Sequence, residues 1–460
     1  MKKVAFAVLG CKVNQYETEA MAGLFRHCGY DVVDFSAAAD VYIVHTCAVT
    51  QQAERKSRQI IRQAIRKNPD AVIAATGCYS QIAAAQISRI PGVDVVVGTQ
   101  DRGKIVAMVE AAATGRRPVI TVDDIMQATE FEELPVHEYP SRTRASLKIE
   151  EGCDQFCAYC IVPYTRGPVR SRAIAAIENE AERLAAQGFR EIVLTGIHLG
   201  AYGKDTGGRP DLADVIEALQ AVDGIERLRL SSIEPTEVSE RLLAMLAASP
   251  KVCPHLHIPL QSGDDTVLRR MNRRYSTAEY AAVIDRVRAT ITNVGISTDV
   301  IVGFPGETAE QFTNTCNFVE EVRFGRMHIF QYSRRTGTPA AKMPNQISPA
   351  EKERRSKQLL GIAARMAGEF HRRFIGHTLD VLAERMNAGT GLMEGLTGNY
   401  IRVLFPGSDC LRGEIVPVLI KQATPEHLAG ELVNRPDRCG GREINQPGQQ
   451  DSAEVPAKNK

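Results

Sequence analysis

The chain has 460 residues, of which 44% are hydrophobic and 24% charged, a composition typical of a globular protein. This length exceeds one ordinary hydrophobic core, so two or three domains are expected. The formal net charge of +1 excludes recognition of a polyanion by a global positive field. No apolar run reaches bilayer length, and the N-terminal run lacks a signal-peptide pattern, so we expect a cytoplasmic protein without a membrane partner.

The first 115 residues predict a doubly wound α/β domain with a parallel sheet. Short apolar strands are expected at residues 4–9, 41–44, 71–76 and 93–98, with amphipathic helices between them. Continuous apolar strands that alternate with helices are typical of a parallel sheet covered on both faces. Residues 116–144 break this alternation with scattered Pro, Asp and Glu and are expected to form a linker.

Residues 145–370 resume the alternation at a larger period. Strands are expected at 146–151, 191–196, 227–233, 255–260, 297–304 and 327–333. These units predict a partial (βα)6 half-barrel, whose chemistry would lie at the carboxyl ends of its strands. Residues 371–434 predict a small all-β module with turn glycines. Residues 435–460 lose their apolar side chains and predict a disordered tail.

Three of the 11 cysteines, Cys153, Cys157 and Cys160, directly follow the first strand expected in the half-barrel. Thiolates at this spacing can hold one face of a four-iron cluster and leave one iron without a protein ligand. That iron can chelate S-adenosylmethionine (SAM), whose reductive cleavage yields a 5′-deoxyadenosyl radical. The alternatives are a structural zinc site or a chance spacing. Zinc prefers four protein ligands, and no fourth lies nearby in the sequence.

A second set, Cys11, Cys47 and Cys78, recurs about once per strand–helix unit of the N-terminal domain. Each falls at the carboxyl end of an expected strand, and in a parallel sheet these ends share one edge. The three thiols can therefore converge on a ligand, or they can be unrelated buried thiols. The spacing alone leaves both readings open.

The CxxxCxxC motif after the first strand of a half-barrel resembles the signature of the radical SAM superfamily. The longer string EGCDQFCAYCIVPYTRGPVRSR is similar to that of its methylthiotransferase branch. So are LGCKVNQYETEAM, HTCAVTQQAERKSRQ, ATGCYSQ and YSRRTGTPA, and the C-terminal module resembles a TRAM domain. The sequence around Cys11 is most similar to that of the MtaB subfamily.

This resemblance implies two [4Fe–4S] clusters, one on each cysteine set, with SAM as cofactor. It implies methylthiolation of N6-threonylcarbamoyladenosine at tRNA position 37, with an electron donor such as flavodoxin or ferredoxin and a sulfur donor that stays open. The alternatives are isopentenyladenosine in tRNA, a ribosomal-protein aspartate, or, in another class, an RNA-binding protein with structural clusters. No individual catalytic side chain is assigned.

The resemblance also implies a set of SAM contacts at the ends of the later strands. Glycine allows close approach of a ligand to the backbone, and hydroxyl or amide groups can bind its polar atoms. His45 stands where the family more often has asparagine, and we expect it to form a hydrogen bond rather than to ligate metal. The matching positions for SAM are Thr195, Gly196, Ser231, Ser232, Glu234, Gln261, Ser262 and Gly303.

Local charge gives partial support for an RNA substrate. Residues 51–68 carry six Lys or Arg against one acid, and four arginines (Arg55, Arg58, Arg62, Arg66) share a helical face. This face can seat RNA phosphates or can simply be solvated. Arg269, Arg270, Arg273 and Arg274 form a second basic group. The C-terminal module is not basic, with six Lys or Arg against seven Asp or Glu between residues 371 and 434.

Overall fold

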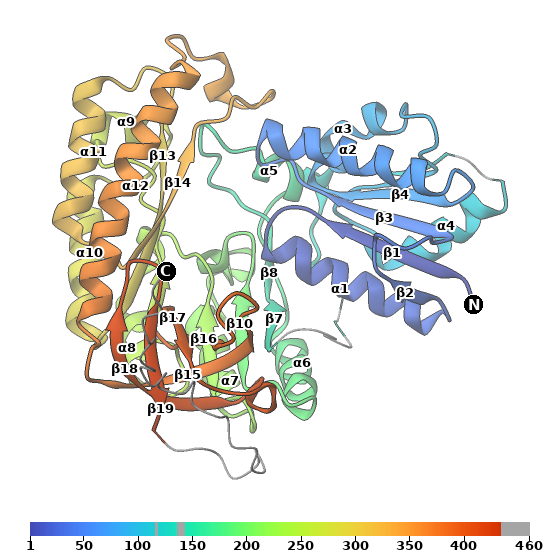
Figure 1. The fold of residues 1–460 in the computed structure, drawn as a ribbon. Helices are drawn as coiled ribbons and strands as arrows, with labels where there is room; N and C mark the ends of the chain where they lie inside the picture. Colours follow the sequence, from blue (N-terminus) through green and yellow to red (C-terminus); the bar gives the residue numbers. More distant parts are fainter. Residues whose placement is uncertain (116–117, 135, 137–142, 434–460) are drawn as a thin grey trace, which may run out of the picture.

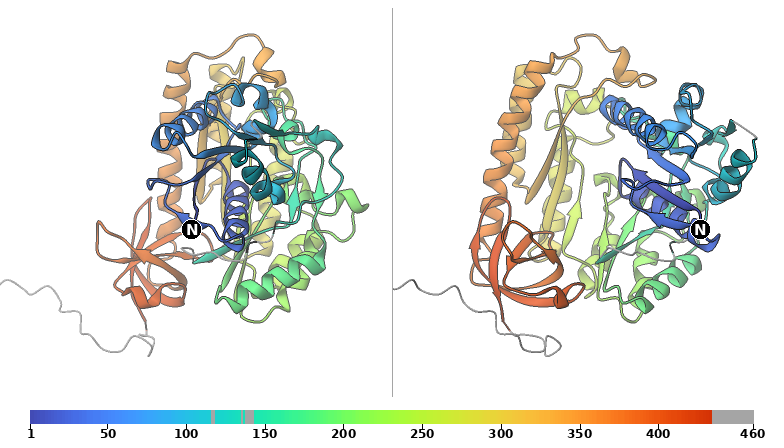
Figure 2. Two further views of the ribbon diagram at one scale, coloured as in Figure 1. Left: turned by 90° about the vertical axis from the view of Figure 1, so that its right-hand side faces the viewer. Right: turned by 45° about the vertical axis from the view of Figure 1, so that its right-hand side comes forward.

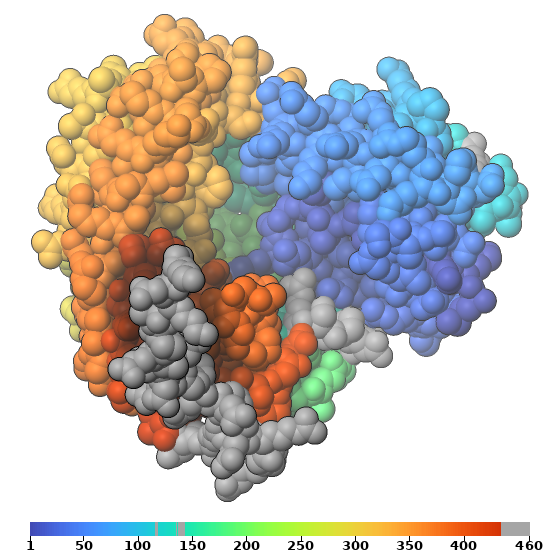
Figure 3. All heavy atoms as spheres, in the orientation of Figure 1, coloured from blue at the N-terminus to red at the C-terminus, as the bar shows by residue number. Residues whose placement is uncertain are grey.

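The computed structural model has three parts: an N-terminal domain, a central domain and a C-terminal barrel (Figure 1). The surface is hollowed to form a recess between these three parts (Figure 3). The structure describes residues 1–115, 118–134, 136 and 143–433. Among these residues, no helix is both long enough and apolar enough to cross a bilayer.

The N-terminal domain is built on a six-stranded parallel sheet in the order β2-β1-β3-β4-β5-β6. Its strands are β1 (Lys3–Val8), β2 (Asp31–Val33), β3 (Val41–Thr46), β4 (Val72–Gly77), β5 (Val95–Val97) and β6 (Val119–Thr121). Helices α1 (Lys12–His27), α2 (Gln51–Lys67), α3 (Cys78–Ile87) and α4 (Ile105–Ala113) connect them. The predicted doubly wound parallel domain is confirmed.

Two edge strands of this sheet were not predicted from the sequence. Strands β2 and β6 have three residues each, too short to stand out as apolar runs. β6 lies inside the segment 116–144, which the sequence predicted to be a linker, and it pairs in parallel with β5. That segment also holds a short 3-10 helix at Ile125–Gln127, so part of it extends the N-terminal domain.

The central domain is an open half-barrel made of two three-stranded parallel sheets (Figure 2). One sheet contains β7 (Arg144–Lys148), β10 (Glu191–Thr195) and β11 (Arg227–Leu230). The other contains β12 (His255–His257), β13 (Gly295–Val302) and β14 (Arg326–Gln331). Parallel bridges from Leu228 to Val252 and from Ser232 to His257 join the two sheets. The predicted six strands are therefore confirmed in order.

Helices cover the outer side of the half-barrel (Figure 1). They are α6 (Ile174–Ala186), α7 (Leu212–Gln220), α8 (Glu240–Ala248), α10 (Thr277–Thr290), α11 (Ala309–Val322) and α12 (Pro349–Arg372). Two shorter helices, α5 (Val162–Arg166) and α9 (Asp265–Arg270), lie in loops. The sequence specifies several helix starts through capping side chains: in α10, Ser276 and Glu279 form a reciprocal capping box.

The C-terminal module is a closed five-stranded barrel in the order β15-β16-β17-β19-β18. Its strands are β15 (Thr378–Met386), β16 (Met393–Thr397), β17 (Arg402–Phe405), β18 (Ile415–Ala423) and β19 (Leu428–Leu432). The predicted all-β module is confirmed, with β16 and β19 as additions. The expected disordered tail, 435–460, lies outside the described residues.

Buried arginines of β11 attach the C-terminal barrel to the half-barrel. The Arg229 guanidinium donates to the carbonyl oxygens of Gly398 (2.8 Å) and Thr397 (3.1 Å). Its Nε lies 2.7 Å from Glu191 Oε1 on the neighbouring strand, and both side chains are fully buried. Arg227 adds a hydrogen bond to the Asp380 carbonyl at 2.8 Å. Together these contacts fix the β16–β17 turn at one end of the half-barrel.

We predict that Arg229→Ala lowers the free energy of unfolding by roughly 3 kcal/mol, because Glu191 stays buried with only more distant cations. The matched control is Arg190→Ala, since Arg190 pairs with Glu414 of the C-terminal module at 2.6 Å and both side chains are about a third exposed (31% and 33%). The control substitution should lower the free energy of unfolding by less than about 1 kcal/mol. Urea titration and amide hydrogen exchange in residues 378–432 measure both effects. Equal losses in the two variants would contradict the assignment.

Candidate metal centres

Cys11, Cys47 and Cys78 lie together at the carboxyl edge of the N-terminal sheet. They follow β1, β3 and β4, which are adjacent in the sheet. The turns are close-packed: a methyl group added to Gly10 would lie 3.2 Å from Cys47 Sγ, and Gly10 has φ +106°. Burial, with smaller contributions from the thiols of Cys78 and Cys11, raises the pKa of the Cys47 thiol to about 11. The structure thus brings the three thiols into one neighbourhood.

Cys153, Cys157 and Cys160 lie in one loop at the start of the half-barrel. The loop is closed by two short antiparallel strands, β8 (Glu150–Glu151) and β9 (Arg170–Ser171). Within it, the Cys160 amide donates to the Cys157 carbonyl at 2.9 Å. Burial raises the pKa of the Cys160 thiol to about 12, and Cys157 adds to the effect. Such thiols ionise when a metal cation replaces the proton.

Each cysteine set has one buried arginine that donates to a sulfur. Arg166 Nε lies 3.2 Å from Cys78 Sγ, and an Arg273 terminal nitrogen lies 3.3 Å from Cys157 Sγ. Arg166 belongs to α5, directly after the Cys160 loop, so the same short helix joins the two cysteine sets. A guanidinium at this distance stabilises negative charge on sulfur.

A buried network of charges surrounds Glu17 between the N-terminal domain and the half-barrel. The Glu17 carboxylate accepts from Arg102 (2.5 Å), Arg166 (2.6 Å) and Lys148 (2.8 Å). Burial alone would raise the pKa of Glu17, but these three cations outweigh it and hold that pKa well below its usual range. Glu151 accepts from Arg166 at 3.1 Å and completes the group. The network fixes one cysteine-bearing domain against the other.

His45 is part of the same packing. Its Nδ1 lies 2.9 Å from Thr18 Oγ1, and its Nε2 lies 3.4 Å from Glu17 Oε2. Burial lowers the pKa of His45 to about 3. These contacts agree with the expected hydrogen-bonding role.

The predicted SAM contacts lie at the carboxyl ends of the half-barrel strands, as expected for their positions. Glu234 forms an ion pair with Arg273, the residue that contacts Cys157, so it is drawn toward the cysteine loop. Ser231 Oγ is buried without a hydrogen-bond partner among the described residues. Thr195 is buried, Ser232 is exposed, and Gln261 has a positive φ of 68°.

Three further positions, besides Glu234, lie close to other groups of the protein. A methyl group at Gly196 would lie 2.5 Å from a Glu150 carboxylate oxygen, and Gly303 donates to Glu307 at 2.6 Å. Ser262 Oγ lies 3.3 Å from Thr315 Oγ1. These contacts account for the three residues even when no SAM is bound. The role of all eight predicted positions in binding SAM therefore stays a prediction.

The basic group at 269–274 is not one surface patch, which corrects the sequence interpretation. Arg273 is buried beside Cys157, and Arg270 donates to the Gly306 carbonyl at 3.1 Å, while Arg269 and Arg274 are exposed. Sequence reasoning missed the role of Arg273 because no periodicity separates a buried arginine from its exposed neighbours. Arg166 was visible within the string TRGPVRSR, but no pattern assigned it to Cys78.

The basic face of α2 is partly retained. Arg55, Arg62 and Arg66 are exposed, whereas Arg58 is half-buried and donates to the Tyr79 hydroxyl at 2.7 Å. Three arginines therefore remain available to a polyanion on this helix.

Comparison with known proteins matches both cysteine-bearing regions. Residues 3–98 match the family described as uncharacterized protein family UPF0004, and residues 147–319 match the radical SAM superfamily. The fold is similar to that of a radical SAM methyltransferase, TsrM, from Kitasatospora setae, with a TM-score of 0.57, 16% identity and coverage of 74% of this chain and 77% of that one. Fold and cysteine loop together define a radical SAM protein.

Relatives that align over nearly the whole chain narrow the class. The threonylcarbamoyladenosine tRNA methylthiotransferase MtaB of Bacillus subtilis is 44% identical, covering 94% of this chain and 97% of its own length. MtaB of Thermotoga maritima is 36% identical over 96% of this chain and 99% of its own. A tRNA-2-methylthio-N(6)-dimethylallyladenosine synthase of Pelotomaculum thermopropionicum is 36% identical over 94% and 98%. The chain belongs to the radical SAM methylthiotransferase family, MtaB type.

This family uses SAM and [4Fe–4S] clusters, and the donor sets fit such groups. Each set offers three thiols and one arginine N–H to sulfur, so a cluster held there keeps one iron free of protein thiolate. Cys11, Cys47 and Cys78 would hold one cluster, and Cys153, Cys157 and Cys160 the other.

We predict that Arg166→Gln and Arg273→Gln each change the reduction potential of a different cluster. Loss of a positive charge and an N–H bond to sulfur makes reduction harder, so each variant should shift its own cluster to a more negative potential. Anaerobic redox titration followed by electron paramagnetic resonance reports each cluster separately when the cysteines of the other set are replaced by alanine. A shift of the same cluster in both variants, or of neither, would refute the pairing.

Proposed function

We propose that the chain methylthiolates tRNA, converting N6-threonylcarbamoyladenosine at position 37 to its 2-methylthio form. The observation that carries the proposal is 44% identity over 94% of the chain to a protein named for this activity. Two cysteine sets linked by Arg166 support it, since Arg166 donates to Cys78 and follows Cys160 within one short helix. SAM is the cofactor, and the electron donor is a low-potential protein such as flavodoxin or ferredoxin.

When bound, the cluster on the half-barrel supplies the electron that cleaves SAM, and the cluster on the N-terminal domain carries the sulfur to be transferred. The protein's own residues position these reactants. Arg273 holds Cys157 and Glu234 together, and Arg166 holds Cys78 against the same loop. The network at Glu17 keeps the two donor sets in a fixed relation.

A deletion strain tests the substrate. Digested tRNA from it should lack 2-methylthio-N6-threonylcarbamoyladenosine and accumulate the unthiolated nucleoside, as measured by nucleoside mass spectrometry. Restoration by a plasmid copy is the control. Loss of the 2-methylthio isopentenyl nucleoside instead, with the threonylcarbamoyl product unchanged, would contradict the proposal.

The division of labour between the cysteine sets gives a further prediction. Cys157→Ala should abolish formation of 5′-deoxyadenosine, because the half-barrel donor set is then incomplete. Cys47→Ala should retain 5′-deoxyadenosine formation and lose methylthiolated product. Both products are quantified from one anaerobic reaction of reconstituted protein with tRNA, and Cys28→Ala, at the exposed C-cap of α1, is the matched control. Loss of SAM cleavage in both cluster variants would refute the division.

A further inference from the structure

A cationic cavity lies between the inner face of the half-barrel and the C-terminal barrel. Its volume is about 480 Å³, and β7, β14, the start of α1 and the strands of the C-terminal barrel contribute to it. It reaches the chain segment that carries Cys11, since its lining includes Lys12. The charged residues that line it are Lys12, Arg144, Arg326, Arg385, Arg402 and Arg412, against Glu384 and Glu394.

The two carboxylates neutralise only part of this positive charge. Glu384 pairs with Arg144 at 2.8 Å. Glu394 is shared by Arg402 at 3.2 Å and Arg385 at 3.4 Å. Among the residues that the structure describes, Lys12 and Arg326 have no carboxylate within ion-pair distance, and both are exposed to solvent. The cavity therefore holds an excess of positive charge.

Lys12 occupies a position that does not favour a cation. It is the first residue of α1, where the helix dipole contributes partial positive charge. A lysine there gains nothing from the helix, and it faces further cations across the cavity. A cation in such a position is expected where a bound anion supplies the negative charge that the protein does not.

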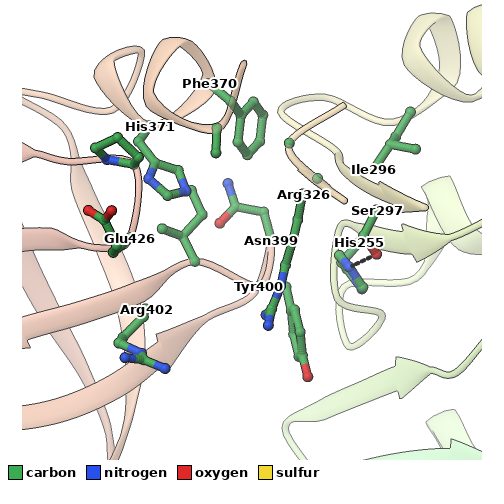
Figure 4. Close-up of a pocket in the computed structure, with 15 residues that line it drawn as sticks. His255, Ile296, Ser297, Arg326, Phe370, His371, Asn399, Tyr400, Arg402 and Glu426 are labelled. Atoms are coloured by element: carbon green, nitrogen blue, oxygen red, sulfur yellow. Dashed lines mark hydrogen bonds between the residues drawn. The ribbon is translucent and has the colours of Figure 1, made fainter. Parts of the chain in front are cut away.

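Tyr400 marks the centre of this positive field. It lies in the β16–β17 turn with a φ of +70°, a left-handed conformation that costs a non-glycine residue free energy. Its ring stacks on His255 at 4.6 Å and lies 5.5 Å from the Arg326 guanidinium. Figure 4 labels these three residues where they line an adjoining pocket. Burial raises the pKa of the Tyr400 phenol, but the surrounding cations outweigh it, and the pKa lies below its ordinary value.

The turn that carries Tyr400 is held firmly. Arg229 donates to the carbonyls of Thr397 and Gly398, and the Ile401 amide donates to Thr397 Oγ1 at 2.9 Å. The C-terminal barrel therefore places Tyr400, Arg402 and the flanking cations at the cavity in a fixed arrangement. It does so although the composition of the barrel is not basic.

We propose that this cavity binds an anionic oxygen group of the RNA substrate, with Lys12 and Arg326 as the residues that contact it. This inference rests on the proposed function, because it takes the anion from the RNA. The same chemistry has two sources: the carboxylate of the threonylcarbamoyl side chain on the target base, or a backbone phosphate next to it. Both present oxygens that Arg326 can bind in bidentate fashion.

Binding of three labelled anticodon stem-loop RNAs to the reconstituted protein tests the proposal. One RNA carries threonylcarbamoyladenosine, the second its neutral methyl ester, and the third dimethylallyladenosine. Affinity is measured by fluorescence anisotropy at several salt concentrations for the wild type, Lys12→Gln and Arg326→Gln. The control is Arg286→Gln, an exposed arginine of α10 outside the cavity, and the iron content of each protein is checked.

If the side-chain carboxylate is the ligand, both cavity variants should bind the first RNA roughly tenfold more weakly and the other two unchanged. If a phosphate is the ligand, all three RNAs should weaken together, and the slope of log K against log salt should fall by about 0.7 per lost contact. Wild-type affinity and salt slope in both cavity variants, or an equal loss in Arg286→Gln, would overturn the proposal.

Failure of the proposed substrate is distinguishable from failure of this site. A wild-type protein that does not methylthiolate the threonylcarbamoyl RNA contradicts the function proposed above. The proposed anion site would still be supported if Arg326→Gln weakened RNA binding and also reduced the salt dependence of that binding.

Discussion

The ion network centred on Glu17 is the interaction on which the arrangement of the molecule depends. Its charges come from α1, from the 3-10 helix at Arg102–Lys104, from β7 and β8 and from α5, so it crosses the boundary between the two cysteine-bearing domains. Three cations (Arg102, Lys148, Arg166) meet three carboxylates (Glu17, Glu132, Glu151). Removing one partner from such a group costs about 3–5 kcal/mol, because a charge is left in the interior. The network therefore ties the two cysteine-bearing domains to one another.

This constraint gives the cysteine sets their relation to one another. Arg166 is a member of the network and also the donor to Cys78, and it follows Cys160 by one short helix. The position of one donor set is therefore tied to that of the other through a single side chain. The C-terminal barrel is fixed from the opposite side by Arg229, so the recess is bounded by parts that each have a buried ionic anchor.

Much of the fold could be predicted from the sequence, because it follows from local patterns. Strands β3 and β4 contain continuous apolar runs, and the half-barrel strands are short segments with recurring apolar residues between helical stretches. The six cysteines follow expected strands at recognisable places. The three-residue strands β2 and β6 were not predicted, because they form by pairing with a neighbouring strand and have no distinct apolar pattern of their own. The linker prediction for 116–144 was wrong at β6 for the same reason.

The charged part of the site was beyond sequence reasoning. Arg273, Lys148 and Glu17 are buried because each contacts a partner far along the chain. Sequence analysis predicts a charged residue to be exposed unless its partner is known. The cationic cavity arises likewise from residues that are unremarkable in their own segments. The six Lys or Arg of the C-terminal module do not make it basic, but its position places three of its arginines in the same cavity as Lys12 and Arg326.

We infer that the buried network couples SAM cleavage to sulfur transfer by fixing the two donor sets. The ratio of 5′-deoxyadenosine to methylthiolated nucleoside in Glu17→Gln, at unchanged iron content, tests this coupling. We expect SAM cleavage to persist while product falls, so that the ratio rises well above that of the wild type. A wild-type ratio in this variant would contradict it.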